Sequence, residues 1–383
     1  MFEAPEIDLQ TTDGEIAVIN LESARRRLWT RFSADPPREG NAEALVENER
    51  LTAQFVGDAT ALDRLETLAE QLVRVDAASA RTALIQAQIA SMVHRFADAR
   101  RDLAQAKFAG AFMDDVRRLE MAIDQACGVN LDRLLHERRQ IAIRHNRVGD
   151  HVALGGLLAD LRDFVGADRA YGEALRAYRD VSPFPVAWVC FQLGVLWGEL
   201  VPEPDTDRAA HWYRKAVECL PKYAKACVHL AEIYASSGRP GDAEALLIPA
   251  VATGDPEVYW RLAHVLAAQG RVREAHIQMQ AARSGFESLL ERHLLAFADH
   301  GAEFYAGRGG NVSRALELAR INVANRPTLR AFEQAHAIAA AAGDRAAATE
   351  LLTAARERWG GTLAFQLSPL AERGSHTWKG AAA

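Results

Sequence analysis

Residues 211–247 read HWYRKAVECLPKYAKACVHLAEIYASSGRPGDAEALL, and this stretch decides the fold class. Its apolar and small residues recur at spacings of 3, 4 and 7, which places one apolar stripe on each of two helices. Ala231 and Ala243 stand where two antiparallel helices would approach most closely, and Gly238 and Pro240 mark the turn between them. The stretch therefore predicts a helix-turn-helix unit.

The same pattern recurs along the chain. Upstream, Gly194 and Ala209 occupy the places of Ala231 and Ala243, with three additional residues that we assign to the turn at 201–205. Further units are centred on residues 154–174, 262–282, 302–327 and 329–355, and a weaker one on 87–106. A repeat of this kind predicts an array in which each unit packs only on its neighbours.

The period of about 34 residues, the small residues at 194, 231 and 243 and the proline at 221 resemble the tetratricopeptide repeat (TPR) family. The resemblance extends over residues 80–360 and is strongest between 187 and 289. It implies an all-α fold, a right-handed superhelical solenoid of about seven or eight TPR-like helix pairs. It also implies a protein-protein interaction scaffold or adaptor, and not an enzyme, because stacked pairs present a long concave surface.

We divide the chain into four parts on the strength of the repeat. These are an N-terminal non-repeat arm (1–41), degenerate helical repeats (42–147), TPR-like repeats (148–361) and a C-terminal cap and tail (362–383). In the arm, residues 11–20 are predicted to form a short strand or an extended segment, and residues 23–32 a helix.

Composition restricts the class of partner. The chain has 45 basic and 51 acidic residues, a formal charge of -6, which argues against nucleic acid. No stretch of about 18 apolar residues is present, so no membrane span is expected. Four cysteines without a CxxC pair, at 127, 190, 219 and 227, and an acidic N-terminus predict a reducing, cytoplasmic location. The sequence does not indicate an oligomeric state.

Motifs for phosphate, dinucleotide, zinc-protease or serine-hydrolase chemistry are absent from the sequence, and no cofactor is expected. The glycine-rich segment 307–311 falls between two predicted helices and is interpreted as a turn. Any function is therefore expected to depend on the surface of the solenoid.

In TPR proteins, ligands contact positions 2, 5, 9 and 12 of the first helices, and the resemblance implies a groove at the matching residues. We expect protein or peptide binding by nine of them: Trp188, Phe191, Lys225, Glu232, Trp260, His264, Asp299, Glu303 and Arg330. Aromatic side chains with spaced charges suit an extended or helical peptide. An equally weighted alternative is that Trp188 and Phe191 only cover the neighbouring repeat. Because these positions carry no asparagine, a clamp for a peptide C-terminal carboxylate is not expected.

Two further function classes stay open. A peptide-sensing regulator would need an effector surface, for which the basic segment 25–31 is the candidate. A metal-binding or enzymatic accessory protein would use the region of His264 and Glu303, because histidine with carboxylates can hold a divalent metal or transfer protons. His293 and His300 stand two helical turns apart, too far to share one ion.

Overall fold

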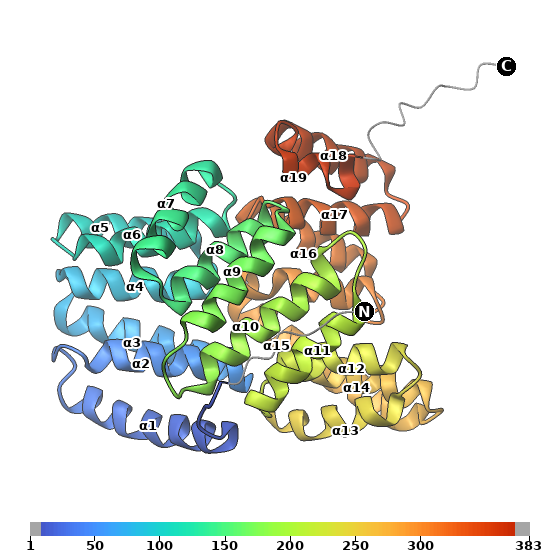
Figure 1. The fold of residues 1–383 in the computed structure, drawn as a ribbon, viewed down its shortest axis with the longest axis horizontal. Coiled ribbons are helices and arrows are strands. Elements are labelled where there is room, and N and C mark those ends of the chain that lie inside the picture. Colours follow the sequence, from blue (N-terminus) through green and yellow to red (C-terminus); the bar gives the residue numbers. More distant parts are fainter. Residues whose placement is uncertain (1–8, 372–383) are drawn as a thin grey trace.

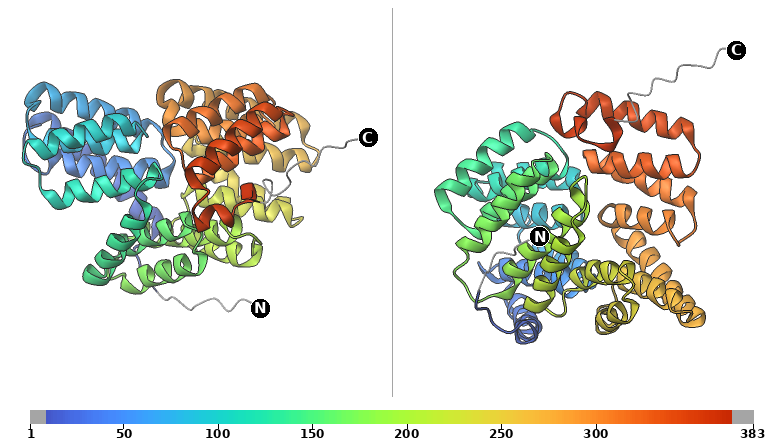
Figure 2. Two further views of the ribbon diagram at one scale, coloured as in Figure 1. Left: turned by 90° about the horizontal axis from the view of Figure 1, so that it is seen from above. Right: turned by 45° about the vertical axis from the view of Figure 1, so that its right-hand side comes forward.

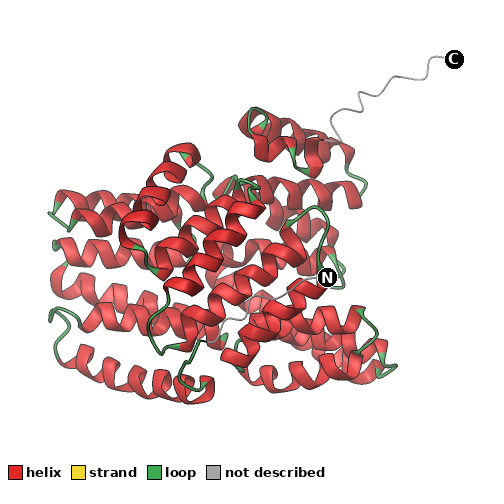
Figure 3. Ribbon diagram, viewed as in Figure 1, coloured by secondary structure: helices red, strands yellow, loops and turns green. Residues whose placement is uncertain are grey.

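The computed structural model describes residues 9–371, and every regular element among them is a helix (Figures 1 and 3). The N-terminal helices are α1 (Gly14–Ala34), α2 (Asn41–Leu51), α3 (Thr60–Asp76), α4 (Ala80–Met92), α5 (Phe96–Phe108), α6 (Met113–Ala126) and α7 (Leu131–His145). The central helices are α8 (Val148–Asp160), α9 (Phe164–Ala177), α10 (Pro183–Val195), α11 (Thr206–Cys219), α12 (Ala224–Ser236), α13 (Pro240–Ala250) and α14 (Pro256–Ala268). The C-terminal helices are α15 (Val272–Ala306), α16 (Val312–Asn325), α17 (Leu329–Ala341), α18 (Arg345–Trp359) and α19 (Leu363–Gln366). Three short π or 3-10 turns extend helices: η1 (Thr52–Val56), η2 (Leu196–Leu200) and η3 (Val251–Thr253).

Consecutive helices pack as pairs, as the repeat predicts. The most extensive contacts join α4 to α5, α8 to α9, α10 to α11, α12 to α13, and α14 to α15. The long α15 is two helices joined across a kink at His293, whose backbone leaves the helical region, and α15 also pairs with α16. The all-α superhelical solenoid expected from the sequence is confirmed by this packing.

Small residues permit the close approach within each pair. A Cβ atom on Gly194 would lie 2.4 Å from Cε1 of Tyr213, and one on Gly155 would lie 2.7 Å from Cε1 of Tyr171. In each case a tyrosine ring of the second helix lies directly on the backbone of the first. Glycine at these positions is therefore a packing requirement, because a larger residue would overpack the pair.

Within the N-terminal arm, α1 begins at Gly14, so the strand or extended segment expected for residues 11–20 is wrong from Gly14 onward. Asp13 caps α1 by accepting hydrogen bonds from the backbone N–H groups of Glu15 and Ile16, at 2.9 and 3.1 Å. Val18 and Leu21 then pack into the apolar cluster formed by α8–α12. Local capping and this distant packing together outweigh the weak helical preference of the β-branched residues.

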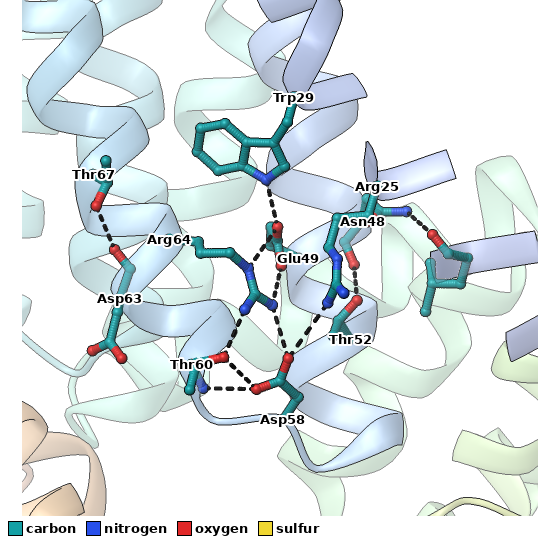
Figure 4. A network of polar contacts seen from close by, with 11 residues as sticks. Arg25, Trp29, Asn48, Glu49, Thr52, Asp58, Thr60, Asp63, Arg64 and Thr67 are labelled. Atoms are coloured by element: carbon teal, nitrogen blue, oxygen red, sulfur yellow. Dashed lines mark hydrogen bonds and ion pairs between the residues drawn. The ribbon is translucent and has the colours of Figure 1, made fainter. Parts of the chain in front are cut away.

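A buried polar network fixes the arm to the following helices (Figure 4). Glu49 of α2 is fully buried and accepts hydrogen bonds from Nε1 of Trp29 at 2.7 Å and from Arg64 at 2.9 and 2.7 Å. Arg64 also donates to Asp58 at 3.0 Å. The network therefore holds α1, α2 and α3 around the loop at Gly57, which adopts a left-handed conformation (φ +74°). The basic residue Arg25 pairs with Asp58 as well, at 3.4 Å.

The superhelix completes a turn and meets itself (Figure 2). Hydrogen bonds join residues that are 229 to 231 positions apart: Arg292 with Asp63, Asn325 with His94, and Arg358 with Cys127. At about 34 residues per pair, this separation corresponds to about seven pairs per turn. The α15–α18 region therefore stacks on α3–α6.

The remaining expectations concern the cysteines, membrane spans and the C-terminal tail. The four cysteines are free, three of them are buried and Cys219 is half-buried. Among residues 9–371, none of the helices combines the length and apolar character needed to cross a bilayer. The tail expected at 362–383 lies outside the described residues from position 372 onward.

Candidate functional site

A cavity of about 490 Å³ lies between the pair of α10 and α11, where η2 extends α10, and the first helices of the next two pairs, α12 and α14. Its lining is Gly198, Glu199, Thr206, Tyr213, His229, Ala231, Glu232, Ile233, Ala235, Ser236, Arg261, His264 and Val265. Apolar side chains and several charged groups therefore meet in one concave space. Such a mixture is typical of a binding site.

One wall of the cavity comes from the insertion that the sequence shows between Gly194 and Ala209. The turn expected at 201–205 lies between η2 and α11, and the residues before it continue α10 as the π-helical turn η2. This turn carries Glu199, which accepts a hydrogen bond from the Tyr213 hydroxyl at 2.9 Å and lies 2.7 Å from Nδ1 of His229. The insertion therefore creates a carboxylate–histidine pair at the cavity.

Glu199 and His229 stabilise each other's charged forms. Burial would raise the pKa of Glu199, but the hydrogen bond and charge of His229 outweigh it and lower the pKa to about 2. Burial would likewise lower the pKa of His229, but Glu199 outweighs it and the pKa is raised. The pair is therefore ionised near neutral pH.

A Glu199→Gln variant is expected to lose roughly 1–2 kcal/mol of unfolding free energy at pH 5.5. The raised histidine pKa stabilises the fold below its ordinary value of 6.5, and this is lost as pH rises through the folded value. The lowered glutamate pKa stabilises the fold above its ordinary value of 4.5, and this is lost as pH falls toward about 2. Urea denaturation at pH 5.5 and 9 should therefore show a larger loss at pH 5.5. An equal loss at both values would contradict the charged pair.

Arg261 connects three repeats at the floor of the cavity. Its guanidinium lies 3.0 Å from Glu232 of α12, 3.3 Å from Glu257 of α14 and 3.0 Å from Glu303 of α15. The same group lies 3.7 Å from the centre of the Trp260 ring. The guanidinium therefore brings Glu232 and Glu303, both expected in the groove, to a common partner.

Trp260 and His264 form a second, buried element of the site. Trp260 is only 4% exposed, and its indole N–H donates to Nε2 of His264 at 3.0 Å. Burial, followed by the charge of Arg261, lowers the pKa of His264 to about 4, so His264 is a neutral acceptor. Within residues 9–371, no set of three or more His, Cys, Asp or Glu side chains is arranged to hold a metal ion. The alternative of a metal site at His264 and Glu303 therefore has no ligand set among these residues.

Two of the three aromatic residues of the expected groove, Trp188 and Phe191, belong to the apolar cluster that includes Phe55 of the N-terminal part. Trp188 stacks on Phe191 with ring centroids 6.0 Å apart, and Phe55 of η1 approaches Trp188 edge-on at 6.4 Å. Phe191 is 6% exposed and packs against Tyr223. Phe191 therefore contributes to the core, and Trp188 is half-buried beside it.

The three other groove residues lie apart from one another. Asp299 pairs with Arg326 at 2.6 Å. Lys225 is half-buried on α12 and is among the cations that lower the pKa of Glu257. Arg330 of α17 is exposed, and its Nη2 lies 3.6 Å from Glu199, so it reaches the cavity from a distant repeat.

Most of the cavity lining was absent from the expected set, including four residues that form its ion pairs and hydrogen bonds: Glu199, Tyr213, His229 and Arg261. Arg261 could have been found, because it follows Trp260 directly and lies between acidic positions of neighbouring repeats. Glu199 could not have been found from the sequence, because its position depends on how the insertion folds.

Comparison with known proteins gives structural neighbours only. No protein-family model and no curated protein matches the sequence. A chain of the APC/C hetero-tetramer Cut9–Hcn1 is similar at 14% identity and a TM-score of 0.44, with 88% of this chain and 63% of that chain covered. This chain thus spans less than two thirds of that chain's length.

Two further solved structures are similar over a smaller share of this chain. PilW, a type IV pilus biogenesis factor, is 15% identical with a TM-score of 0.31, covering 57% of this chain and 96% of PilW. MamA is 20% identical with a TM-score of 0.24, covering 40% of this chain and 88% of MamA. Since these similarities are low, the architecture is established by the repeat in the sequence and the packing of the helices. On both grounds the chain is a superhelical solenoid of tetratricopeptide-like helix pairs.

Proposed function

We propose that the chain is a protein-interaction scaffold that holds a short segment of a partner protein in the cavity among α10, α12 and α14. The observation that carries this proposal is the lining of the cavity. Ile233, Ala235 and Val265 offer an apolar surface, and Glu232 and Arg261 place fixed charges beside it. The apolar surface can bury a side chain of the partner, and the fixed charges can orient it.

Preorganisation supports the proposal. The charged groups are already held by intramolecular partners on three repeats, so few side chains need to be ordered when a segment binds. Binding of this kind loses less conformational entropy than binding to mobile side chains. Trp260 is not the expected free anchor, because its ring is buried against Phe304 at 5.5 Å and His264.

The test compares partner binding by a variant whose cavity is filled with binding by a variant whose outer surface is altered. Ala235→Trp should occupy the cavity, because Ala235 is half-buried in its wall. Glu218→Lys on α11 is the control, because Glu218 is exposed and outside the cavity. Proteins that co-purify with the tagged chain from its native host are identified first, and their affinity for each variant is then measured.

We expect Ala235→Trp to weaken binding at least about tenfold, a change of about 1.4 kcal/mol, and Glu218→Lys to leave it unchanged. Both variants should keep the helical content of the parent protein. If Glu218→Lys abolished binding and Ala235→Trp did not, the partner would use the outer surface, and the proposal would be wrong.

A further inference from the structure

The two turns of the superhelix meet along a line of contacts that we call the seam. One side of the seam contains Asp63, His94, Cys127 and Gly128, and the other side contains Arg292, His293, Leu295, Asn325 and Arg358. The residues that pair across the seam are 201 to 231 positions apart in the sequence. The seam is therefore a contact between distant parts of one chain.

The seam combines polar contacts with a few apolar ones, in which Phe297 packs against the cluster of α1–α4 and the Trp359 ring lies on Gly128. Nε2 of His293 lies 2.8 Å from Asp63, and Asn325 donates its side-chain N–H to the His94 carbonyl at 2.9 Å. Arg358 donates to the Cys127 carbonyl at 3.2 Å. Neighbouring helix pairs, by contrast, bury continuous apolar clusters. Among the described residues, no helix of α3–α6 packs as closely on α15–α18 as consecutive helices pack on each other, so the seam is weaker than the interfaces within a turn.

Two ion pairs cross the interior of the superhelix near the cavity. Arg330 of α17 reaches Glu199 at 3.6 Å, and Glu333 on the same helix pairs with Arg162, which lies between α8 and α9. Both contacts join α17 to repeats on the opposite side of the turn, and Glu199 is part of the cavity wall. The closed superhelix therefore ties α17 to Glu199 in the cavity wall.

We infer that the superhelix opens and closes along the seam and that opening admits a macromolecular partner to the cavity. The inference rests on the proposed function, because it concerns access to the same cavity. Separating α15–α18 from α3–α6 would carry α17 away and break both crossing ion pairs. The apolar clusters of the central repeats would be kept, since they contain no residue of the seam. A stack of pairs that contact only their neighbours permits such a motion.

The first test measures opening. Asp63→Arg places two arginines opposite each other and removes the bond to His293. The matched control is Glu70→Arg on the same helix, because Glu70 pairs only locally with Arg74 at 3.5 Å. Small-angle X-ray scattering should show a larger radius of gyration for Asp63→Arg, with unchanged helical circular dichroism. Glu70→Arg should match the parent protein, and the double variant Asp63→Arg with Arg292→Asp should return toward it.

Unchanged dimensions for Asp63→Arg would overturn the inference. If Asp63→Arg instead lost helical content, Asn325→Ala is the second variant, because it removes one seam hydrogen bond without adding a charge. Expansion of Asn325→Ala with full helical content would support opening. Loss of helical content there too would overturn the inference, because the seam would then belong to a single cooperative unit.

The second test measures access. A cysteine introduced as Ala235→Cys is labelled with N-ethylmaleimide and with a polyethylene-glycol maleimide, and the rates are corrected for the parent cysteines. We expect Asp63→Arg to raise the rate of the large reagent relative to the small one by about tenfold. If Asp63→Arg expanded the protein without changing this ratio of labelling rates, the inference that opening admits a partner to the cavity would be overturned. That result would leave the proposed function intact, because neither measurement involves a partner.

Discussion

An Arg261→Met variant is expected to lose about 3–5 kcal/mol of unfolding free energy at pH 7. The substitution removes the cation shared by Glu232, Glu257 and Glu303 while keeping an apolar side chain next to Trp260. Glu257 is the most buried of the three, with a side chain only 12% exposed, whereas Glu303 is 53% exposed and well screened. A buried carboxylate that loses one of its cations is destabilising.

The pH dependence identifies this cause. Without Arg261 the carboxylates would have raised pKa values, and protonation would relieve their repulsion as pH falls. Urea denaturation should therefore show a smaller loss at pH 5 than at pH 7. Arg101→Met is the control, since Arg101 forms only exposed, local pairs, and it should change stability by less than about 0.5 kcal/mol. A loss below about 1 kcal/mol at pH 7 would show that Arg261 does not hold the three repeats together.

A Phe55→Ala variant is also expected to lose about 3–5 kcal/mol. Phe55 is 3% exposed and packs against Phe184 and Tyr223, with ring centroids 5.2 and 5.0 Å apart. It is the main aromatic contact between the N-terminal helices and α10–α12. Its removal should therefore leave a cavity and loosen this contact.

Hydrogen exchange locates the effect of Phe55→Ala. Exchange should accelerate in α1 and α2 more than in α17 and α18, because α1 packs into the same apolar cluster as Phe55. Phe112→Ala is the control, since Phe112 is 69% exposed and should have little effect. Equal acceleration along the whole chain would contradict a local role for Phe55 in docking the N-terminal helices.

The repeat could be predicted from sequence because its determinants are local. Gly194, Ala231 and Ala243 recur at helical spacing, and the turn residues Gly238 and Pro240 separate helices in both sequence and structure. The same register placed Glu232 and Glu303 on the inner helices, where Arg261 joins them. The sequence alone therefore predicts the place of a residue in the fold when that place follows from the period of the repeat.

Other features depend on distant contacts and were not predicted. Residues 11–20 resemble a strand locally, and from Gly14 onward they are helical through the cap at Asp13 and packing on α8–α12. Phe55 contacts Trp188, which is distant in the sequence, and no local pattern indicates this contact. The seam requires the rotation between repeats to accumulate over a full turn, and small angular differences of this kind have no sequence signature.

Site-specific photo-cross-linking in the native host tests the central claim, that the inner cavity holds a partner protein. A photoreactive amino acid is placed at Ser236, an exposed residue of the cavity, and in a second variant at Glu218 on the outer face. We expect Ser236 to capture a defined protein through one short segment, identified by mass spectrometry, and Ala235→Trp to abolish that product. We expect no such product from Glu218. Capture of the partner from Glu218 alone, or capture from Ser236 that survives Ala235→Trp, would contradict binding in the cavity.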